Sequence, residues 1–260
     1  MLKKAKKMKD YSPSEMMIVR AARELEDGQV VFVGIGLPNL AANLAKRLHA
    51  PHIEMIYEAG VFGAHPLRLP LSIGDPTLVS GATAICSIPE IFMYYLQGGL
   101  IDVGMVGAAQ IDRYGNINTT VIGDYQSPKV RLPGIGGASA ISLLAKKMLV
   151  ITNLTKRGFP EKVDFISTPG FLGGKRERDK LPVEGKGPSA IITDLGVFGF
   201  DRVSGEVVLQ SLYPGVTVEE VRERVGWELR ISDRLTTSPE PEKEELRIIR
   251  EELDPRKIYI

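Results

Sequence analysis

The chain has 260 residues, of which 43% are hydrophobic and 25% are charged, an ordinary composition for a folded protein that needs no disulfide or metal to fold. Its 33 basic and 32 acidic side chains give a formal charge of +1, which argues against a nucleic-acid-binding surface spread over the whole protein. The single cysteine, Cys86, excludes an intrachain disulfide and a cysteine-rich metal site. No apolar run approaches the roughly 20 residues that span a bilayer.

Residues 1–10 are basic, with lysines at five positions, Lys3, Lys4, Lys6, Lys7 and Lys9. No apolar segment follows them, so they do not form a secretory signal, and we expect a cytoplasmic protein with no membrane partner. A basic arm for nucleic acid is the alternative for this segment. A flexible, solvated tail over residues 1–10 is favoured, with no nucleic-acid partner.

The pattern of apolar residues then predicts alternating helices and strands. Ser12, Pro13 and Glu15 have the spacing of a helix cap, and Gly28 ends this first helix. Further helices are expected at 39–48, 138–146, 217–224 and 242–252. Strands are expected at 29–33, 53–57, 100–106, 117–122, 148–152, 163–167 and 190–193, with a hairpin of 198–201 and 207–212.

This alternation is typical of an α/β fold with an open, largely parallel sheet and helices on both faces. No linker divides the chain, so residues 11–260 are expected to form a single domain. The charged segment 175–180 (KRERDK) is expected to be an exposed loop, because its mixed charges favour solvent over a phosphate-bearing ligand.

A tight turn at residues 34–38 (GIGLP) follows the first strand and begins like a dinucleotide-binding fingerprint. Asn39 stands where the third glycine belongs, and Pro38 removes a backbone donor, so a Rossmann NAD site is not expected. The turn instead brings backbone amides near some other ligand, which makes Gly36 a candidate for the substrate pocket. The three histidines have no zinc-ligand spacing, and no metal site is expected.

Glu58 comes directly after an apolar strand and is followed by Ala59 and Gly60. In open α/β sheets, ligands bind at the carboxyl ends of strands. Small neighbours leave room for a substrate to reach the carboxylate, so Ala59 and Gly60 are candidate pocket residues. A surface acid or a helix cap is the alternative interpretation of Glu58.

A second glycine-rich segment, residues 133–138 (PGIGGA), precedes a predicted helix and offers unhindered backbone amides. Such a segment can bind phosphate or stabilise an oxyanion; a flexible loop is the alternative. Gln110 follows another strand end and is a candidate to point into the same cleft.

Together these motifs resemble the beta subunit of glutaconate CoA-transferase and its class I CoA-transferase relatives. Residues 107–138 carry the longest similar run, GAAQIDRYGNINTTVIGDYQSPKVRLPGIGGA. Shorter runs are GQVV at 28–31, GIGLP at 34–38, VDFISTPG at 163–170 and IREELDP at 249–255. The similarity extends from about residue 14 to residue 258.

The resemblance implies an open sheet of the CoA-transferase type, related to sugar-phosphate isomerase folds. It implies that Glu58 is the nucleophile that forms a glutamyl-CoA thioester, and that Gly134, Gly136, Gly137 and Ala138 lie near CoA and the oxyanion. Acyl-CoA is then a substrate, and no cofactor is permanently bound. The implied partner is an alpha subunit, in a heterodimer or a heterotetramer of two such pairs.

The sequence departs from the family at Ala59, where the relatives have serine. The acid substrate therefore stays open, as do two alternative functions. One is an acyl-CoA hydrolase of the ring-cleaving type on the same fold. The other is a non-catalytic acyl-CoA-binding subunit.

Overall fold

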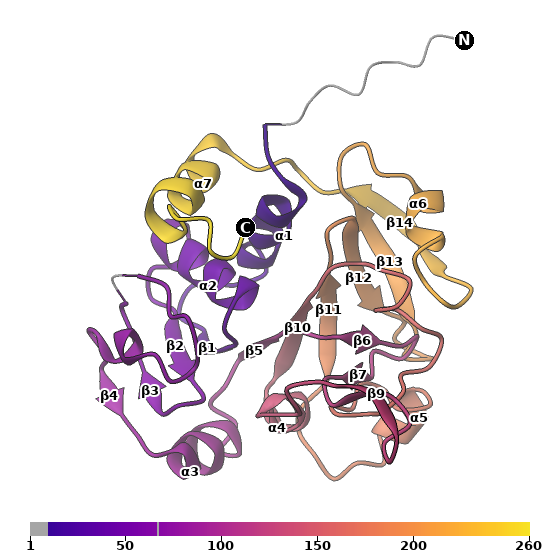
Figure 1. Ribbon diagram of the computed structural model, residues 1–260, viewed down its shortest axis with the longest axis horizontal. Coiled ribbons are helices and arrows are strands. Elements are labelled where there is room, and N and C mark those ends of the chain that lie inside the picture. Colours follow the sequence, from indigo (N-terminus) through magenta and orange to yellow (C-terminus); the bar gives the residue numbers. More distant parts are fainter. Residues whose placement is uncertain (1–9, 67) are drawn as a thin grey trace.

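The computed structural model describes residues 10–66 and 68–260, and its main feature is a ten-stranded mixed sheet (Figure 1). The strand order is β14-β13-β12-β11-β10-β5-β1-β2-β3-β4. The strands are β1 (Val30–Val33), β2 (Glu54–Tyr57), β3 (Val61–Phe62), β4 (Ala84–Ile85), β5 (Val103–Val106), β10 (Lys147–Ile151), β11 (Pro188–Ile192), β12 (Gly196–Phe200), β13 (Val207–Leu212) and β14 (Arg230–Thr237).

The five central strands, β2, β1, β5, β10 and β11, are all parallel to one another. Antiparallel strands extend the sheet on both sides, through β3 and β4 at one edge and β12 and β13 at the other. Because the central strands are parallel, their carboxyl ends all lie on one side of the sheet, which we call its carboxyl edge. Their amino ends all lie on the opposite side, the amino edge.

Side chains of the central strands alternate between two hydrophobic cores. Val31 and Val33 belong to one core and Phe32 to the other, as the twofold period of a strand requires. Because these strands are buried on both faces, their sequences are continuous apolar runs rather than alternating ones.

Helices cover both faces, as the sequence predicts. The first core is closed by α1 (Pro13–Ala22), α2 (Leu37–Leu48) and η3 (Ile248–Leu253), which continues from α7 (Lys243–Arg247). The second is closed by η2 (Ile91–Leu96), α4 (Ala138–Leu144) and α6 (Val218–Arg222). The remaining short helices are η1 (Pro76–Val79), α3 (Ile88–Glu90) and α5 (Lys175–Arg178).

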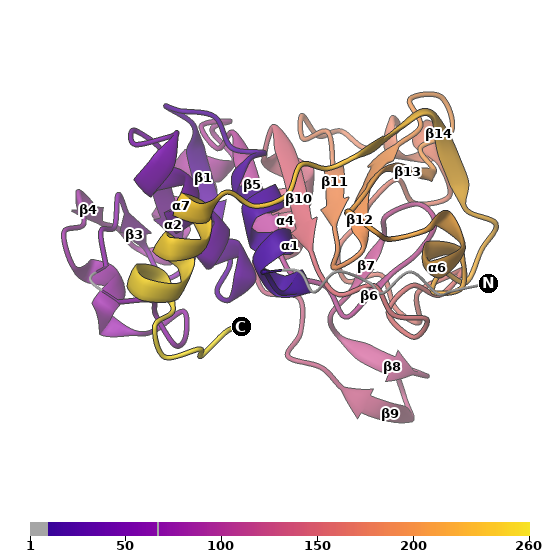
Figure 2. The same ribbon diagram turned by 90° about the horizontal axis from the view of Figure 1, so that it is seen from above.

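Two small hairpins lie outside the main sheet, β6 (Gln110–Ile111) with β7 (Ile117–Asn118), and β8 (Val121–Gly123) with β9 (Pro128–Arg131). Figure 2 shows the β8–β9 hairpin projecting from the body of the protein. The strand predicted at 117–122 is thus divided between two hairpins.

Two sequence predictions are corrected by the structure, and two elements were not predicted. Residues 163–167 form no strand, and only an isolated bridge pairs the neighbouring Thr168 with Ile117. The charged segment 175–180 contains the short helix α5 instead of being only a loop. Strand β14 and the helical segment 88–96 were not predicted. The tail predicted at residues 1–10 lies almost entirely outside the described residues.

Candidate active site

Glu58 lies where β2 leaves the carboxyl edge of the sheet and the chain turns back into β3. The Gly60 amide donates to the Tyr57 carbonyl (2.9 Å), and Gly60 has a φ of +104°, which favours glycine. A Cβ at this position would lie 2.0 Å from the Cys86 carbonyl oxygen. The turn therefore needs a glycine at residue 60, and it leaves Glu58 half-buried at its tip.

The end of β2, directly before Glu58, is anchored to α2. The Tyr57 hydroxyl donates to Asn39 Oδ1 in α2 (2.6 Å), and both residues are buried. Burial raises the pKa of the Tyr57 phenol, so this hydroxyl stays protonated and keeps donating. The position of Glu58 is thereby fixed from the helix side of the sheet.

The glycine-rich segment lies directly against the Glu58 carboxylate, although the two are far apart in sequence. A Cβ on Gly136 would lie 3.7 Å from Glu58 Oε2, and a Cβ on Gly137 would lie 3.5 Å from Glu58 Cδ. Gly136 has a φ of +51°, and Gly137 is the N-cap of α4. The absence of side chains at these two positions makes the close approach of backbone and carboxylate feasible.

The backbone amides of this segment differ in how they are used. The Gly134 amide donates to the Thr119 carbonyl (2.8 Å), and the Ala138 amide donates to the Ile135 carbonyl (3.2 Å). Among the described residues, the amides of Gly136 and Gly137 have no hydrogen-bond acceptor. Of the four predicted positions, these two have donors free to receive a negative oxygen beside Glu58.

Phe92, which sequence reasoning missed, forms an apolar wall at the same place. Its Cζ would lie 2.7 Å from a Cβ on Gly137, and its ring packs on Phe32 with the centroids 5.6 Å apart. Phe92 is carried by η2, whose aromatic run gave no periodic signal in the sequence. The carboxylate of Glu58 and the ring of Phe92 thus both lie against Gly137.

The other candidate pocket residues have different surroundings. Ala59 is exposed beside Glu58, and Gly36 opens α2 with no atom within 4 Å of the position that a Cβ would take. Gln110 is buried, and its amide is engaged within the chain. Its Oε1 accepts from Asn118 Nδ2 (2.7 Å) and its Nε2 donates to Asp164 (3.2 Å). These bonds give Gln110 a structural role in the β6–β7 hairpin.

Within the described part of the chain, the Glu58 carboxylate makes no hydrogen bond and no ion pair. No group of three or more potential ligands from His, Cys, Asp and Glu, suited to a metal ion, occurs among residues 10–66 and 68–260. A carboxylate without a counter-ion, next to two free amides, is suited to attack a carbonyl carbon whose oxygen the amides then hold.

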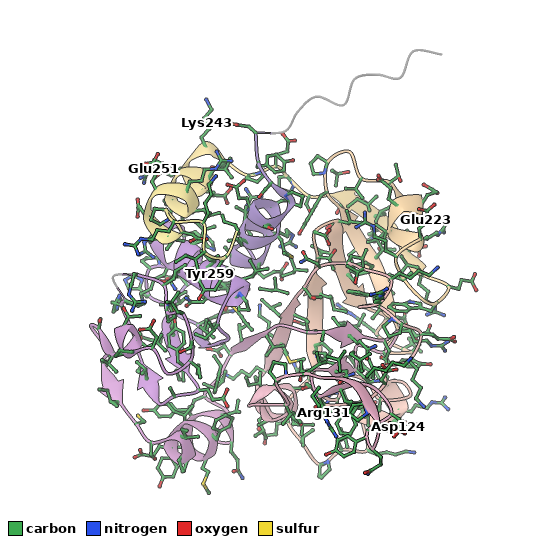
Figure 3. The ribbon with its side chains drawn as sticks, in the orientation of Figure 1. Asp124, Arg131, Glu223, Lys243, Glu251 and Tyr259 are labelled. Carbon is green, nitrogen blue, oxygen red and sulfur yellow. The ribbon has the colours of Figure 1, made fainter. Side chains whose placement is uncertain are left out.

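None of the helices formed by the described residues has the length and apolar character needed to cross a lipid bilayer. Figure 3 shows the side chains over the whole molecule, with charged residues such as Glu223, Lys243 and Glu251 at its periphery.

The chain is similar to known proteins over most of its length. The family model described as "Coenzyme A transferase" matches residues 14–224. The chain is 51% identical over 243 residues to the B subunit of 3-oxoadipate CoA-transferase from Pseudomonas knackmussii, a match that covers 94% of each chain. It is 35% identical over 258 residues to the B subunit of glutaconate CoA-transferase from Acidaminococcus fermentans, a match that covers 96% of each.

The crystal structure of glutaconate coenzyme A-transferase from Acidaminococcus fermentans superposes with a TM-score of 0.90 at 34% identity. That match covers 96% of this chain and 98% of the other. The resemblance drawn from the sequence motifs and the expected fold are both confirmed. The chain belongs to the coenzyme A transferase family.

Proposed function

We propose that this chain is the nucleophile-bearing subunit of a two-subunit CoA-transferase that acts through a covalent glutamyl-CoA thioester on Glu58. The observation that carries the proposal is the contact between the Glu58 carboxylate and the Gly136–Gly137 backbone. It places a carboxylate without a partner among the described residues beside two free amide donors.

The proposed reaction has two halves that mirror each other. The Glu58 carboxylate attacks the acyl-CoA carbonyl carbon, and the carbon–sulfur bond breaks, giving a mixed anhydride and CoA thiolate. The thiolate attacks the Glu58 carbonyl carbon and releases the first acid as a carboxylate. An incoming carboxylate then attacks this thioester, and the returning thiolate takes the new acyl group and regenerates Glu58.

The glycine amides have a defined task in these steps. Each attack forms a tetrahedral carbon with a negative oxygen, which the amides of Gly136 and Gly137 would hold. One such donor typically lowers the activation barrier by about 2.7–4 kcal/mol. The Phe92 ring excludes water from one side, which protects the anhydride and thioester from hydrolysis.

The acid substrate we propose is a dicarboxylate of the 3-oxoadipate type. The identity to the 3-oxoadipate enzyme's subunit is 51%, against 35% for the glutaconate enzyme's subunit, over similar lengths. Both relatives are B subunits by name, and Ala59 and Gly136 beside the nucleophile are exposed. We therefore propose that an alpha subunit covers this edge of the sheet and supplies the remaining pocket.

Borohydride trapping tests the covalent step, because borohydride reduces a thioester but not a free carboxylate. The complex of the chain with its alpha subunit is incubated with acyl-CoA, treated with borohydride and digested for mass spectrometry. We expect inactivation, with Glu58 converted to a hydroxy-amino acid that has lost one oxygen and gained two hydrogens. Borohydride without acyl-CoA should leave the enzyme active.

A Glu58→Ala complex is the matched control, since removal of a half-buried group at a turn should leave the fold intact. It should show no adduct and lose more than about a thousandfold in transfer rate. Full inactivation of the wild type without a change on the Glu58 peptide would assign the nucleophile elsewhere. Turnover to free acid without inactivation would favour the hydrolase.

A further inference from the structure

A large basic pocket lies at the edge of the sheet opposite to Glu58. It has a volume of about 890 Å³ and is formed where β10 and β11 begin, beneath the last turn of α4. The loop of residues 181–187 closes it, and Gly185 donates to the Leu143 carbonyl (2.9 Å). Because α4 runs from the glycine segment at Glu58 to this pocket, its seven residues separate the two places by about 10 Å or more.

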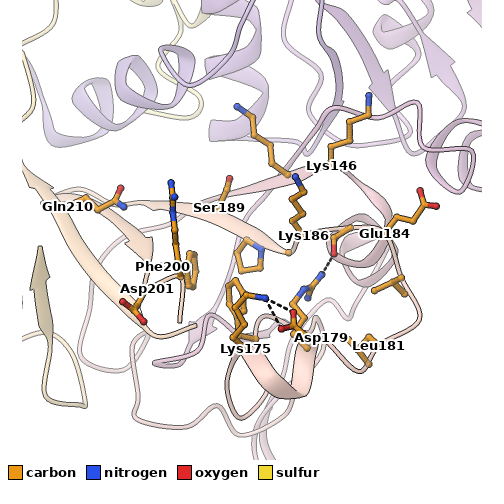
Figure 4. A pocket seen from close by; sticks show the side chains of 18 residues that line it. Lys146, Lys175, Asp179, Leu181, Glu184, Lys186, Ser189, Phe200, Asp201 and Gln210 are labelled. Carbon is orange, nitrogen blue, oxygen red and sulfur yellow. Dashed lines mark hydrogen bonds and ion pairs between the residues drawn. The ribbon is translucent and has the colours of Figure 1, made fainter. Parts of the chain in front are cut away.

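The lining of this amino-edge pocket is strongly cationic, whereas the whole chain carries only +1. Three acidic side chains, Asp179, Glu184 and Asp201, face six basic ones, Lys146, Lys147, Lys175, Arg178, Lys186 and Arg202. Figure 4 shows Lys186 between Phe200 on one side and Glu184 on the other.

Some of these cations are already paired, and others are free. Lys175 pairs with Asp179, and Lys146 pairs with Asp102 (2.7 Å). Lys186 and Arg202 make no ion pair or hydrogen bond with any residue that the structure describes. Lys147 donates to the Glu24 carbonyl (3.1 Å), so Lys186 and Arg202 are the exposed lining cations that have no partner among the described residues.

Arg178 adds a buried cation at the back of the pocket. It is only 5% exposed, and its terminal nitrogens donate to four carbonyls, including those of Gly170 (2.6 Å) and Ser142 (2.6 Å). No carboxylate among the described residues pairs with it. Its Nε–H makes no hydrogen bond with any described residue. This nitrogen is also not among the fully buried polar atoms that lack a partner. A buried charge without a counter-ion is costly, and an anion in the pocket would compensate it.

The backbone and aromatic rings complete a shaped site. Gly187 lies flat against Arg178, since a Cβ there would be 2.7 Å from the guanidinium carbon. Phe200 and Phe171, with ring centroids 5.0 Å apart, are both half-buried in the lining. A partly exposed ring beside clustered cations suits a planar base that carries phosphates.

We propose that the amino-edge pocket binds a nucleotide at a site separate from the active site. The phosphates would contact Lys186, Arg202 and the free Nε–H of Arg178, and the base would pack on Phe200. The volume lies within the range of small-molecule sites, roughly 300–1,000 Å³. Nothing in this inference depends on the proposed transfer reaction.

Isothermal titration calorimetry of the full chain with ADP tests the proposal, with saturating CoA present so that any CoA site is already filled. We expect one ADP to bind per chain. The double variant Lys186→Glu/Arg202→Glu should weaken ADP at least tenfold. The control Lys243→Glu/Arg256→Glu makes the same charge change at exposed positions outside the pocket, and it should stay within twofold of the wild type.

Pyrophosphate separates the phosphate contacts from base stacking. Phe200→Leu should weaken ADP at least fivefold and leave pyrophosphate binding within twofold. An absence of ADP binding beside CoA would overturn the second site, because either no site exists or CoA itself occupies it. Equal losses in the pocket variant and the charge control would reduce the effect to general electrostatics and would also overturn the assignment. Thermal melts of each variant verify folding.

Discussion

Gly137→Ala tests whether the backbone at the start of α4 must remain bare for catalysis. Gly137 has helical dihedral angles, φ −81° and ψ −5°, so alanine meets no backbone strain there. Alanine also lowers the conformational entropy of the unfolded chain, which stabilises the folded state by about 0.4–1 kcal/mol. Its Cβ, however, would lie 2.7 Å from Phe92 Cζ and 3.5 Å from Glu58 Cδ. Carbon atoms pack at about 3.5–4.0 Å, so the ring must retreat by roughly 1 Å.

The expected effects on stability and activity differ in size. Overpacking typically costs about 1–3 kcal/mol, and after the entropic gain we expect the free energy of unfolding to fall by about 1–2 kcal/mol. Displacing groups beside the nucleophile by about 1 Å should lower kcat/KM by about a hundredfold. The measurements are denaturant unfolding of the chain and the transfer rate of the complex with its alpha subunit.

Two further variants make the result specific. Gly74→Ala adds the same methyl group where no atom lies within 4 Å, and its activity should match the wild type. Adding Phe92→Leu to Gly137→Ala removes the ring atoms that clash and should recover at least tenfold of the lost activity. A Gly137→Ala enzyme within threefold of the wild-type rate would refute the idea that a bare backbone is needed beside Glu58.

Three other predictions concern the fold and the assembly. Burial raises the pKa of Glu15, but hydrogen bonds from Arg250 and the helix cap outweigh it and leave that pKa lowered. Glu15→Gln should therefore reduce the free energy of unfolding at pH 7 by less than about 1 kcal/mol. Unfolding measured as a function of pH should show this difference from the wild type vanishing as the pH falls below about 4. Gly60→Ala should cost more than about 3 kcal/mol in urea unfolding, because its Cβ would lie 2.0 Å from the Cys86 carbonyl, whereas Gly28→Ala, also at positive φ but with no atom within 4 Å, should cost about 1 kcal/mol. The isolated, folded chain should show no transfer from acyl-CoA to dicarboxylates in a coupled assay; clear turnover without a partner would contradict the two-subunit proposal.

The central strands and the position of Glu58 at a strand end were predictable because their signals are local. The apolar run ending at Val33 is typical of a strand buried on both faces, and Glu58 follows a similar run. The parallel arrangement then brings every carboxyl end to one edge, where a glycine segment before α4 also lies. Fold rules thus relate two motifs that are far apart in the sequence.

Other elements depend on pairing that no local pattern reveals. Residues 163–167 have apolar, β-branched character, yet Ile166 is 42% exposed and the segment lacks a partner strand. Conversely, β14 is rich in polar and charged residues because it lies at the edge of the sheet, where one side faces solvent. Phe92 escaped prediction because its contact with Gly137 joins η2 to α4, and nothing in either sequence specifies the other.

The chemistry proposed at Glu58 depends on backbone geometry more than on side chains. In this proposal Glu58 is the reactive group, and its closest described neighbours from the glycine segment are Gly136 and Gly137, which have no side chains to select a substrate. The acyl group must then be recognised by residues farther out and, on our proposal, by the alpha subunit. The same nucleophile and amides therefore suit different acids, and substrate choice can change without altering the reacting centre. Transfer rather than hydrolysis depends on excluding water, a task for the Phe92 wall and for whatever covers the exposed side of Glu58.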